Sequence, residues 1–212
     1  TLDILGKRDD GYHDMRMVMK SIDLHDVVTI TPREKAGLTL TTDLPFLPKG
    51  DGNIATKAAA RFFQSTGLPA PGLSIDIRKS IPVCAGMAGV SSDGAAVLRA
   101  LDVMYKLPAR GVDMRNVALS VGSDVPFMLT GGLARVRGTG EDLFFIENKA
   151  ELFIVGLMSG EVATARAYAE FDRLHESGAF CPTDNDKLCE LLLSGDPSAV
   201  ELAGNALYAP AC

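Results

Sequence analysis

A chain of 212 residues that is 47% hydrophobic and 23% charged can bury a core, either as one large domain or as two small ones. Its net charge of −6, without a long basic run, argues against non-specific nucleic-acid binding, and no stretch approaches the roughly 18 apolar residues of a membrane span. Its 4 cysteines are widely spaced and form no Cys-x-x-Cys pair, which favours a reduced protein of the cytoplasm.

The first third of the chain alternates short strands with turns. Alternating and β-branched patterns predict strands over residues 1–5, 15–23, 26–31 and 38–42, the last of them pairing nearby in an antiparallel meander. Asn53 is a good N-cap for a helix over residues 54–65, which Gly67 closes. A further strand is predicted over residues 73–79.

The rest of the chain contains further helices, a hairpin and one more strand. Helices are predicted from near Ser91 onward and over residues 114–120, followed by a hairpin of residues 131–140 and 142–146. A buried strand over residues 152–158 then precedes helices over residues 163–174, 186–193 and 198–207. A composition change near Asn148 predicts an N-terminal domain, residues 1–148, and a partial C-terminal domain, residues 149–212. The start at Thr1 without Met and the stop straight after a helical pattern predict a fragment, truncated at both ends.

Residues 82–92 join the strand over residues 73–79 to the helix that starts near Ser91, and they carry the first chemical signal. Gly86 and Gly89 allow positive φ or the close approach of a ligand. Free N–H groups at a helix N-terminus bind anions, of which phosphate is the usual one. Taken alone, however, the pattern favours a tight turn kept small for packing over a phosphate site.

Two further clusters carry polar chemistry. Tyr12 and His13 follow a glycine at the end of a polar turn, where the pair can stack on a ring and hydrogen-bond to its edge. A surface tyrosine beside a solvated histidine is the alternative. Pro126 biases the residue before it away from helix, so Asp124 is expected on a turn or at a helix end. There it can act as a general base, or it can satisfy the amides of its own turn.

Other catalytic motifs are missing from the sequence. It contains no Gly-x-x-x-x-Gly-Lys-Ser/Thr, no Gly-x-Ser-x-Gly and no His-Glu-x-x-His. A Walker-type phosphate loop, a hydrolase nucleophile elbow and this zinc motif are therefore excluded.

The three clusters occur in this order in one known family, and the sequence resembles that family, the 4-diphosphocytidyl-2-C-methyl-D-erythritol kinases. The family belongs to the superfamily of galactokinase, homoserine kinase, mevalonate kinase and phosphomevalonate kinase. Residues 2–13 resemble its N-terminal signature, residues 82–92 its phosphate loop and residues 122–127 its catalytic-aspartate segment. The resemblance implies an α+β, two-domain small-molecule kinase fold, with a ribosomal-protein-S5-like N-terminal domain and an incomplete, ferredoxin-like C-terminal domain.

The resemblance also implies a reaction. The family transfers phosphate from ATP, with Mg²⁺, to the 2-hydroxyl of 4-diphosphocytidyl-2-C-methyl-D-erythritol, in the non-mevalonate route to isoprenoid and terpenoid precursors. Its implied partners are therefore this small molecule and ATP, with no nucleic acid and no membrane. The chain is expected to act as a monomer or a homodimer, and the resemblance assigns no metal ligands.

Individual residues take implied roles from the same resemblance. Asp124 is the implied catalytic carboxylate, His13 is implied to read the cytosine edge, and Tyr12 and Tyr168 are implied to lie against the cytosine ring. Thr164 is implied to lie near the substrate. The residues implied to wrap the ATP phosphates are Pro82, Val83, Cys84, Ala85, Gly86, Met87, Ala88, Gly89, Val90, Ser91 and Ser92.

The sequence departs from the family pattern in several places. Val90 stands where the family usually has a third glycine, and a β-branched residue resists positive φ, so a distorted loop is expected. Gly94 replaces the usual alanine, which weakens the first helical turn by up to about 1 kcal/mol. The resemblance puts the catalytic lysine upstream of Thr1, and no lysine in the chain is a replacement. Two alternatives stay open: a binding-only or inactive relic of this kinase fold, and a related kinase for another alcohol.

Overall fold

The structure is a computed structural model, and it describes residues 1–106, 112–147, 154, 164–175 and 182–207. These residues form two compact units: one comprises Thr1–Ile22, Cys84–Gly86 and Gly131–Cys212, and the other comprises Asp23–Val83 and Met87–Thr130. The first strands therefore pack with the later part of the chain rather than with the strands that follow them. This grouping differs from the predicted division near Asn148, a residue that lies outside the described ranges. The two domains predicted from the sequence, residues 1–148 and 149–212, stay a prediction.

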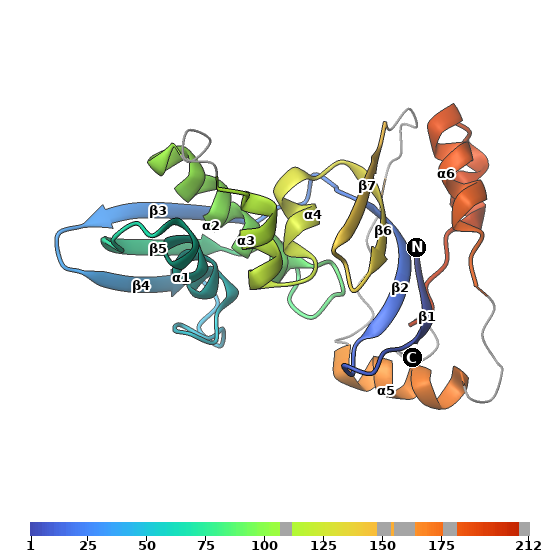
Figure 1. The fold of residues 1–212 in the computed structure, drawn as a ribbon, viewed down its shortest axis with the longest axis horizontal. Helices are drawn as coiled ribbons and strands as arrows, with labels where there is room; N and C mark the ends of the chain where they lie inside the picture. The colour runs from blue at the N-terminus through green and yellow to red at the C-terminus, as the bar shows by residue number, and fades with distance from the viewer. Residues whose placement is uncertain (107–111, 148–153, 155–163, 176–181, 208–212) are drawn as a thin grey trace. The chain divides into compact units, whose positions relative to one another are not determined.

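The first unit is built on a four-stranded antiparallel sheet. Its strands lie in the order β1 (Leu2–Lys7), β2 (His13–Lys20), β6 (Leu133–Gly138) and β7 (Asp142–Ile146). The last two strands form the hairpin that the sequence predicts. The unit also contains the helices α5 (Thr164–His175) and α6 (Asn185–Ser194), which Figure 1 shows, and the 3-10 helix η2 (Pro197–Leu202).

Two small apolar clusters hold these elements on the sheet. Phe171 of α5 packs with Ile4 of β1, so α5 lies against the first strand. Leu188 and Leu192 of α6 pack with Val18 of β2, together with residues of β6 and η2. The helix expected over residues 198–207 is wrong, because the chain forms only the short η2 there. Apart from residue 154, the strand expected over residues 152–158 falls outside the described ranges.

The second unit packs four helices against a three-stranded sheet. The strands lie in the order β3 (Val27–Arg33), β5 (Gly72–Arg78) and β4 (Gly37–Thr42). The helices are α1 (Ile54–Thr66), α2 (Gly89–Tyr105), α3 (Met114–Val121) and α4 (Val125–Thr130). One continuous core joins them, and it includes Phe62 of α1, Ile75 of β5 and Leu98 of α2.

The strand order of this sheet corrects the expected antiparallel meander. β5 lies between β3 and β4, antiparallel to the former and parallel to the latter. β5 is the most buried strand of the sheet, because its apolar residues Leu73, Ile75 and Ile77 are all buried. Because parallel neighbours require a crossover connection, α1 connects β4 to β5.

The ends of α1 are those that the sequence predicts. The Asn53 side chain accepts a hydrogen bond from the Ala55 amide at 2.9 Å, and Gly67 closes the helix in the left-handed conformation with a φ of 65°. None of the helices within the described ranges is long and apolar enough to cross a membrane.

Candidate active site

The loop between β5 and α2 passes through left-handed backbone at Cys84, Gly86 and Ala88, with φ of 59°, 68° and 52°. Glycine adopts this region readily, whereas each other residue there costs about 1–2 kcal/mol. Val90 lies instead inside α2, where its φ is not positive and its side chain is half exposed. The distortion expected at Val90 is therefore wrong, and the strain lies at Cys84 and Ala88.

The first turn of α2 presents unpaired backbone donors. The helix begins at Gly89 rather than near Ser91, and its N-cap residue, Ala88, offers no side-chain hydrogen bond. The first helical bond runs from the Ser92 amide to the Ala88 carbonyl at 2.9 Å, so the amides of Gly89, Val90 and Ser91 have no helical acceptor. These donors, at the positive end of a 17-residue helix, suit an anion such as phosphate.

The two glycines of the loop are needed for different reasons. A Cβ added at Gly89 would lie 2.8 Å from Cγ2 of Ile81, which is closer than side-chain atoms approach one another. At Gly86 an added Cβ would meet nothing within 4 Å, and only its positive φ favours glycine. Gly89 therefore sets how closely α2 approaches the start of the loop.

Three charged side chains lie buried at the base of the loop. Lys79 follows β5, Asp26 precedes β3, and Asp93 lies in α2; the Lys79 ammonium contacts both carboxylates. Burial opposes the charge of Lys79 and of Asp26, yet their mutual hydrogen bond raises the pKa of Lys79 and lowers that of Asp26. For Asp93 burial dominates and raises the pKa to about 6, against the effect of Lys79. The Lys79 ammonium is thus paired with two carboxylates of the fold, those of Asp26 and Asp93.

Asp124 lies on the turn between α3 and α4, as predicted. Its carbonyl accepts a hydrogen bond from the Met128 amide at 3.2 Å, which makes it the residue that opens α4. Burial raises the pKa of the Asp124 carboxyl above its ordinary value of 3.8. Within the described part of the chain, no side chain pairs with this carboxylate. A carboxylate with a raised pKa and no ion partner is a better proton acceptor than an ordinary aspartate.

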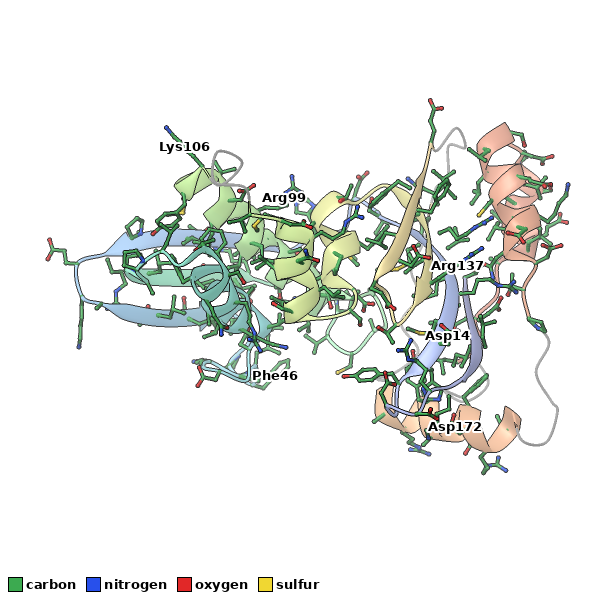
Figure 2. All side chains as sticks on the ribbon, in the orientation of Figure 1. Asp14, Phe46, Arg99, Lys106, Arg137 and Asp172 are labelled. Carbon is green, nitrogen blue, oxygen red and sulfur yellow. The ribbon has the colours of Figure 1, made fainter. Side chains whose placement is uncertain are left out.

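In the other unit, the imidazole of His13 is buried between β2 and α5. Its Nε2 lies 2.6 Å from Oδ1 of Asp172, and its ring stacks on Tyr168 with 4.8 Å between the centroids. Lys7 Nζ donates to the second oxygen of Asp172 at 2.6 Å; Figure 2 shows Asp172 on α5. Because a carboxylate only accepts hydrogen bonds, Nε2 carries the proton of the neutral ring and Nδ1 is left as an acceptor.

The sequence interpretation missed Asp172. Hydrogen bonds from Lys7 and then from His13 lower the pKa of Asp172, which keeps the carboxylate ionised. A signal was present, because Tyr168, Phe171 and Asp172 are spaced i, i+3, i+4 and so share one face of a helix. The pairing of that face with His13 follows only from the fold.

The structure brings some of the predicted site residues together within each unit. His13 and Tyr168 are in contact, whereas the neighbouring Tyr12 is exposed, and Thr164 is described only as the first residue of α5. In the other unit Asp124 opens a helix, α4, that packs in the same core as α2. Across the described ranges, no three His, Cys, Asp or Glu side chains gather as a metal site.

Comparison with known proteins identifies proteins to which this chain is similar. Residues 53–132, which contain the loop and Asp124, match the model of the GHMP kinases N terminal domain. The chain is 38% identical over 173 residues to 4-diphosphocytidyl-2-C-methyl-D-erythritol kinase of Alkaliphilus metalliredigens, which covers 81% of this chain and 59% of that protein. It is 41% identical over 168 residues to the protein of the same name from Acetivibrio thermocellus, covering 79% and 58%. The chain thus spans less than two thirds of these curated relatives.

A solved structure extends the likeness to the whole chain. It is the crystal structure of a 4-(cytidine 5'-diphospho)-2C-methyl-D-erythritol kinase, which is 30% identical in sequence. The superposition has a TM-score of 0.71 and covers 99% of this chain and 72% of that chain. The α+β architecture described above is therefore the architecture of that kinase.

Proposed function

We propose that this chain, which belongs to the 4-diphosphocytidyl-2-C-methyl-D-erythritol kinase family, supplies the phosphate loop and the general base of an ATP-dependent kinase. The acceptor is the 2-hydroxyl of the cytidyl-methylerythritol substrate, and the reaction belongs to isoprenoid precursor synthesis. The observation that carries the proposal is the uncapped start of α2, whose first amides have no helical acceptor beside a glycine loop.

In this proposal the loop and Asp124 divide the work of phosphoryl transfer. The amides of Gly89, Val90 and Ser91 hold the phosphate oxygens of ATP, so that negative charge meets the positive end of α2. Asp124 accepts or orients the proton of the attacking hydroxyl, and its raised pKa favours that role. Such a reaction depends on positioning and charge stabilisation rather than on covalent catalysis by the protein.

The proposed Mg²⁺ fits the residues at the start of α2. Mg²⁺ is commonly held by substrate phosphates and one or two protein oxygens rather than by an all-protein cage. This agrees with the lack of a cluster of three potential ligands in the described ranges. The Ser92 hydroxyl donates a hydrogen bond to the Gly89 carbonyl at 2.8 Å. Ser91 is therefore the serine of this turn whose hydroxyl would hold the Mg²⁺ ion. When bound, the ion neutralises charge on the phosphates.

His13 is the proposed reader of the cytosine base. With the Nε2 proton directed to Asp172, Nδ1 accepts a hydrogen bond from the amino group of cytosine, while the Tyr168 ring supports the imidazole. Uracil presents a carbonyl oxygen at the same position, which would place two acceptors against each other. Tyr12 is exposed and is proposed to lie against the base, and Thr164 is proposed to lie near the rest of the substrate.

Ligand titrations of the chain test this proposal. Calorimetry with a non-hydrolysable ATP analogue and with cytidine diphosphate should show binding of both, and uridine diphosphate should bind about tenfold or more weakly. Asp124→Asn should leave both affinities unchanged, and in a full-length version of the protein it should abolish phosphate transfer to the cytidyl substrate. Failure to bind either ligand would identify an inactive relic of the fold. Binding of the ATP analogue without a preference for cytidine would identify a kinase for another alcohol.

We also propose the reduced cytoplasm as the compartment of this protein, with ATP and the small-molecule substrate as its partners. The dispersed cysteines support this assignment, because Cys84 and Cys189, the two within the described ranges, are free thiols. Fractionation of the cells that make the protein tests the compartment directly.

A further inference from the structure

The three charged side chains at the base of the loop are almost completely removed from water. The exposed fractions of the Lys79, Asp26 and Asp93 side chains are 3%, 2% and 7%. Burying an ion pair costs desolvation free energy that largely cancels its Coulombic attraction, so such a group adds little net stability. A role in fixing the position of the chain explains the cluster better.

Each member of the cluster holds a different part of the loop. Asp26 fixes the start, because its Oδ1 accepts hydrogen bonds from the amides of Ser80 at 2.6 Å and Ile81 at 2.8 Å. Its Oδ2 accepts from the Lys79 ammonium. The same ammonium donates to Oδ2 of Asp93 at 2.8 Å, which fixes the early part of α2.

Gly89 shows how close the two ends of the loop come. A Cβ added there would lie 2.8 Å from Ile81 Cγ2 and 3.6 Å from Lys79 Nζ. The ammonium therefore lies beneath the helix turn that presents the unpaired amides. Moving α2 away from the start of the loop would therefore break the contact between Lys79 and Asp93.

We propose that Lys79, bridged to Asp26 and Asp93, is a positioning residue that closes the base of residues 82–92 and holds the amides at the start of α2 where an anion of the phosphate class can bind. This proposal rests on the proposed function of residues 82–92 as the phosphate loop. Asp93 Oδ1 is buried without a hydrogen-bond partner in the described structure, so Asp93 is held chiefly through its contact with Lys79.

A matched pair of substitutions at Asp93 separates positioning from general stability. Asp93→Ala removes the contact between Lys79 and α2 but leaves Lys79 paired with Asp26, so no buried charge loses its only partner. Asp93→Asn keeps an oxygen for Lys79 and is the conservative control. Lys79→Met is the less informative variant, because it would leave two buried carboxylates without their cation.

Amide hydrogen exchange and nucleotide affinity are the two measurements. In the free chain, Asp93→Ala should speed exchange of the peptide covering residues 82–92 about fivefold or more while α1 exchanges as before. Its dissociation constant for a non-hydrolysable ATP analogue with Mg²⁺ should rise about tenfold. Asp93→Asn should resemble the unsubstituted chain in both measurements.

Three results would overturn the proposal. The first is that Asp93→Ala and Asp93→Asn behave alike in both measurements. The second is that Asp93→Ala speeds exchange in α1 as much as in residues 82–92. The third is that Asp93→Ala speeds exchange of residues 82–92 but leaves the dissociation constant for the ATP analogue unchanged. If no variant and not even the unsubstituted chain binds the ATP analogue, the proposed kinase function fails. The exchange comparison would then still decide whether Lys79 and Asp93 hold the loop.

Discussion

Replacing Asp93 by asparagine tests whether burial or the Lys79 ammonium decides the charge of this side chain. Burial raises the pKa of Asp93 from its ordinary value of 3.8 to about 6. A carboxyl group that binds its proton more tightly in the folded state stabilises the fold most below its unfolded pKa, and this stabilisation is lost as the pH rises through the folded pKa. Asp93 therefore favours folding in acid and ceases to do so near neutral pH.

The size of this effect follows from the two pKa values. The full shift corresponds to about 3 kcal/mol, of which about 2 kcal/mol is lost between roughly pH 4.5 and pH 7.5. Asparagine does not titrate but keeps an oxygen for Lys79. The free energy of unfolding of Asp93→Asn, minus that of the unsubstituted chain, should therefore increase by about 2 kcal/mol across this range. Asp26, whose pKa is lowered, loses stabilisation as the pH falls, but it does so in both proteins.

Urea denaturation at several pH values gives this difference directly. Circular dichroism is the suitable probe because the chain contains 0 Trp residues. Asp51→Asn is the control, since Asp51 is exposed on the loop before α1 and its replacement should leave the pH dependence unchanged. A difference between Asp93→Asn and the unsubstituted chain that stays constant, or that decreases as the pH rises, would refute the reasoning. Lys79 would then outweigh burial in setting the charge of Asp93.

Four further substitutions test the roles of the glycines and of the histidine site. Gly94→Ala should raise the free energy of unfolding by about 0.5–1 kcal/mol, because its Cβ would meet α1 only at 3.4 Å; urea denaturation that shows a loss would contradict this. Gly89→Ala should weaken binding of an ATP analogue about tenfold or more, through its steric clash with Ile81. Gly86→Ala should chiefly cost about 1–2 kcal/mol of stability, so equal binding losses in calorimetry would argue against a specific clash. Asp172→Ala should reduce the preference for cytidine over uridine diphosphate, because the tautomer of His13 is no longer fixed; an unchanged ratio would exclude this role.

Local signals in the sequence predicted the elements that depend on neighbouring residues. Asn53 and Gly67 mark the ends of α1 because a cap involves only the residues within one turn of it. Asp124 lies at the start of α4 as predicted, but the reason given for it was wrong, because Val125, the residue before Pro126, is helical. A proline is tolerated in the first turn of a helix because its missing amide would have no helical acceptor there. The same approach misjudged the start of α2. Ser91, Ser92 and Asp93 are good N-cap types, but they lie inside the helix, and Ala88 is the cap.

Pairing between distant segments could not be predicted in this way. The predicted antiparallel meander was wrong, because the alternation of residues along a strand does not reveal which strand pairs with it. In the structure β5 lies between β3 and β4. Val90 was expected to distort the loop because its backbone conformation was inferred from the family pattern, whereas in the fold it is helical.

The sequence alone determined the family, the α+β class, most of the elements and the identity of the loop, the base and the histidine as candidate residues. These depend on residue types, spacing and interactions within a few residues along the chain. The tertiary structure alone decided which distant polar side chains meet: Asp26 with Lys79, 53 residues apart, and His13 with Asp172, 159 residues apart. Packing of the whole fold brings these segments together, and a polar group that is buried in this way is costly unless it finds a hydrogen-bonding partner.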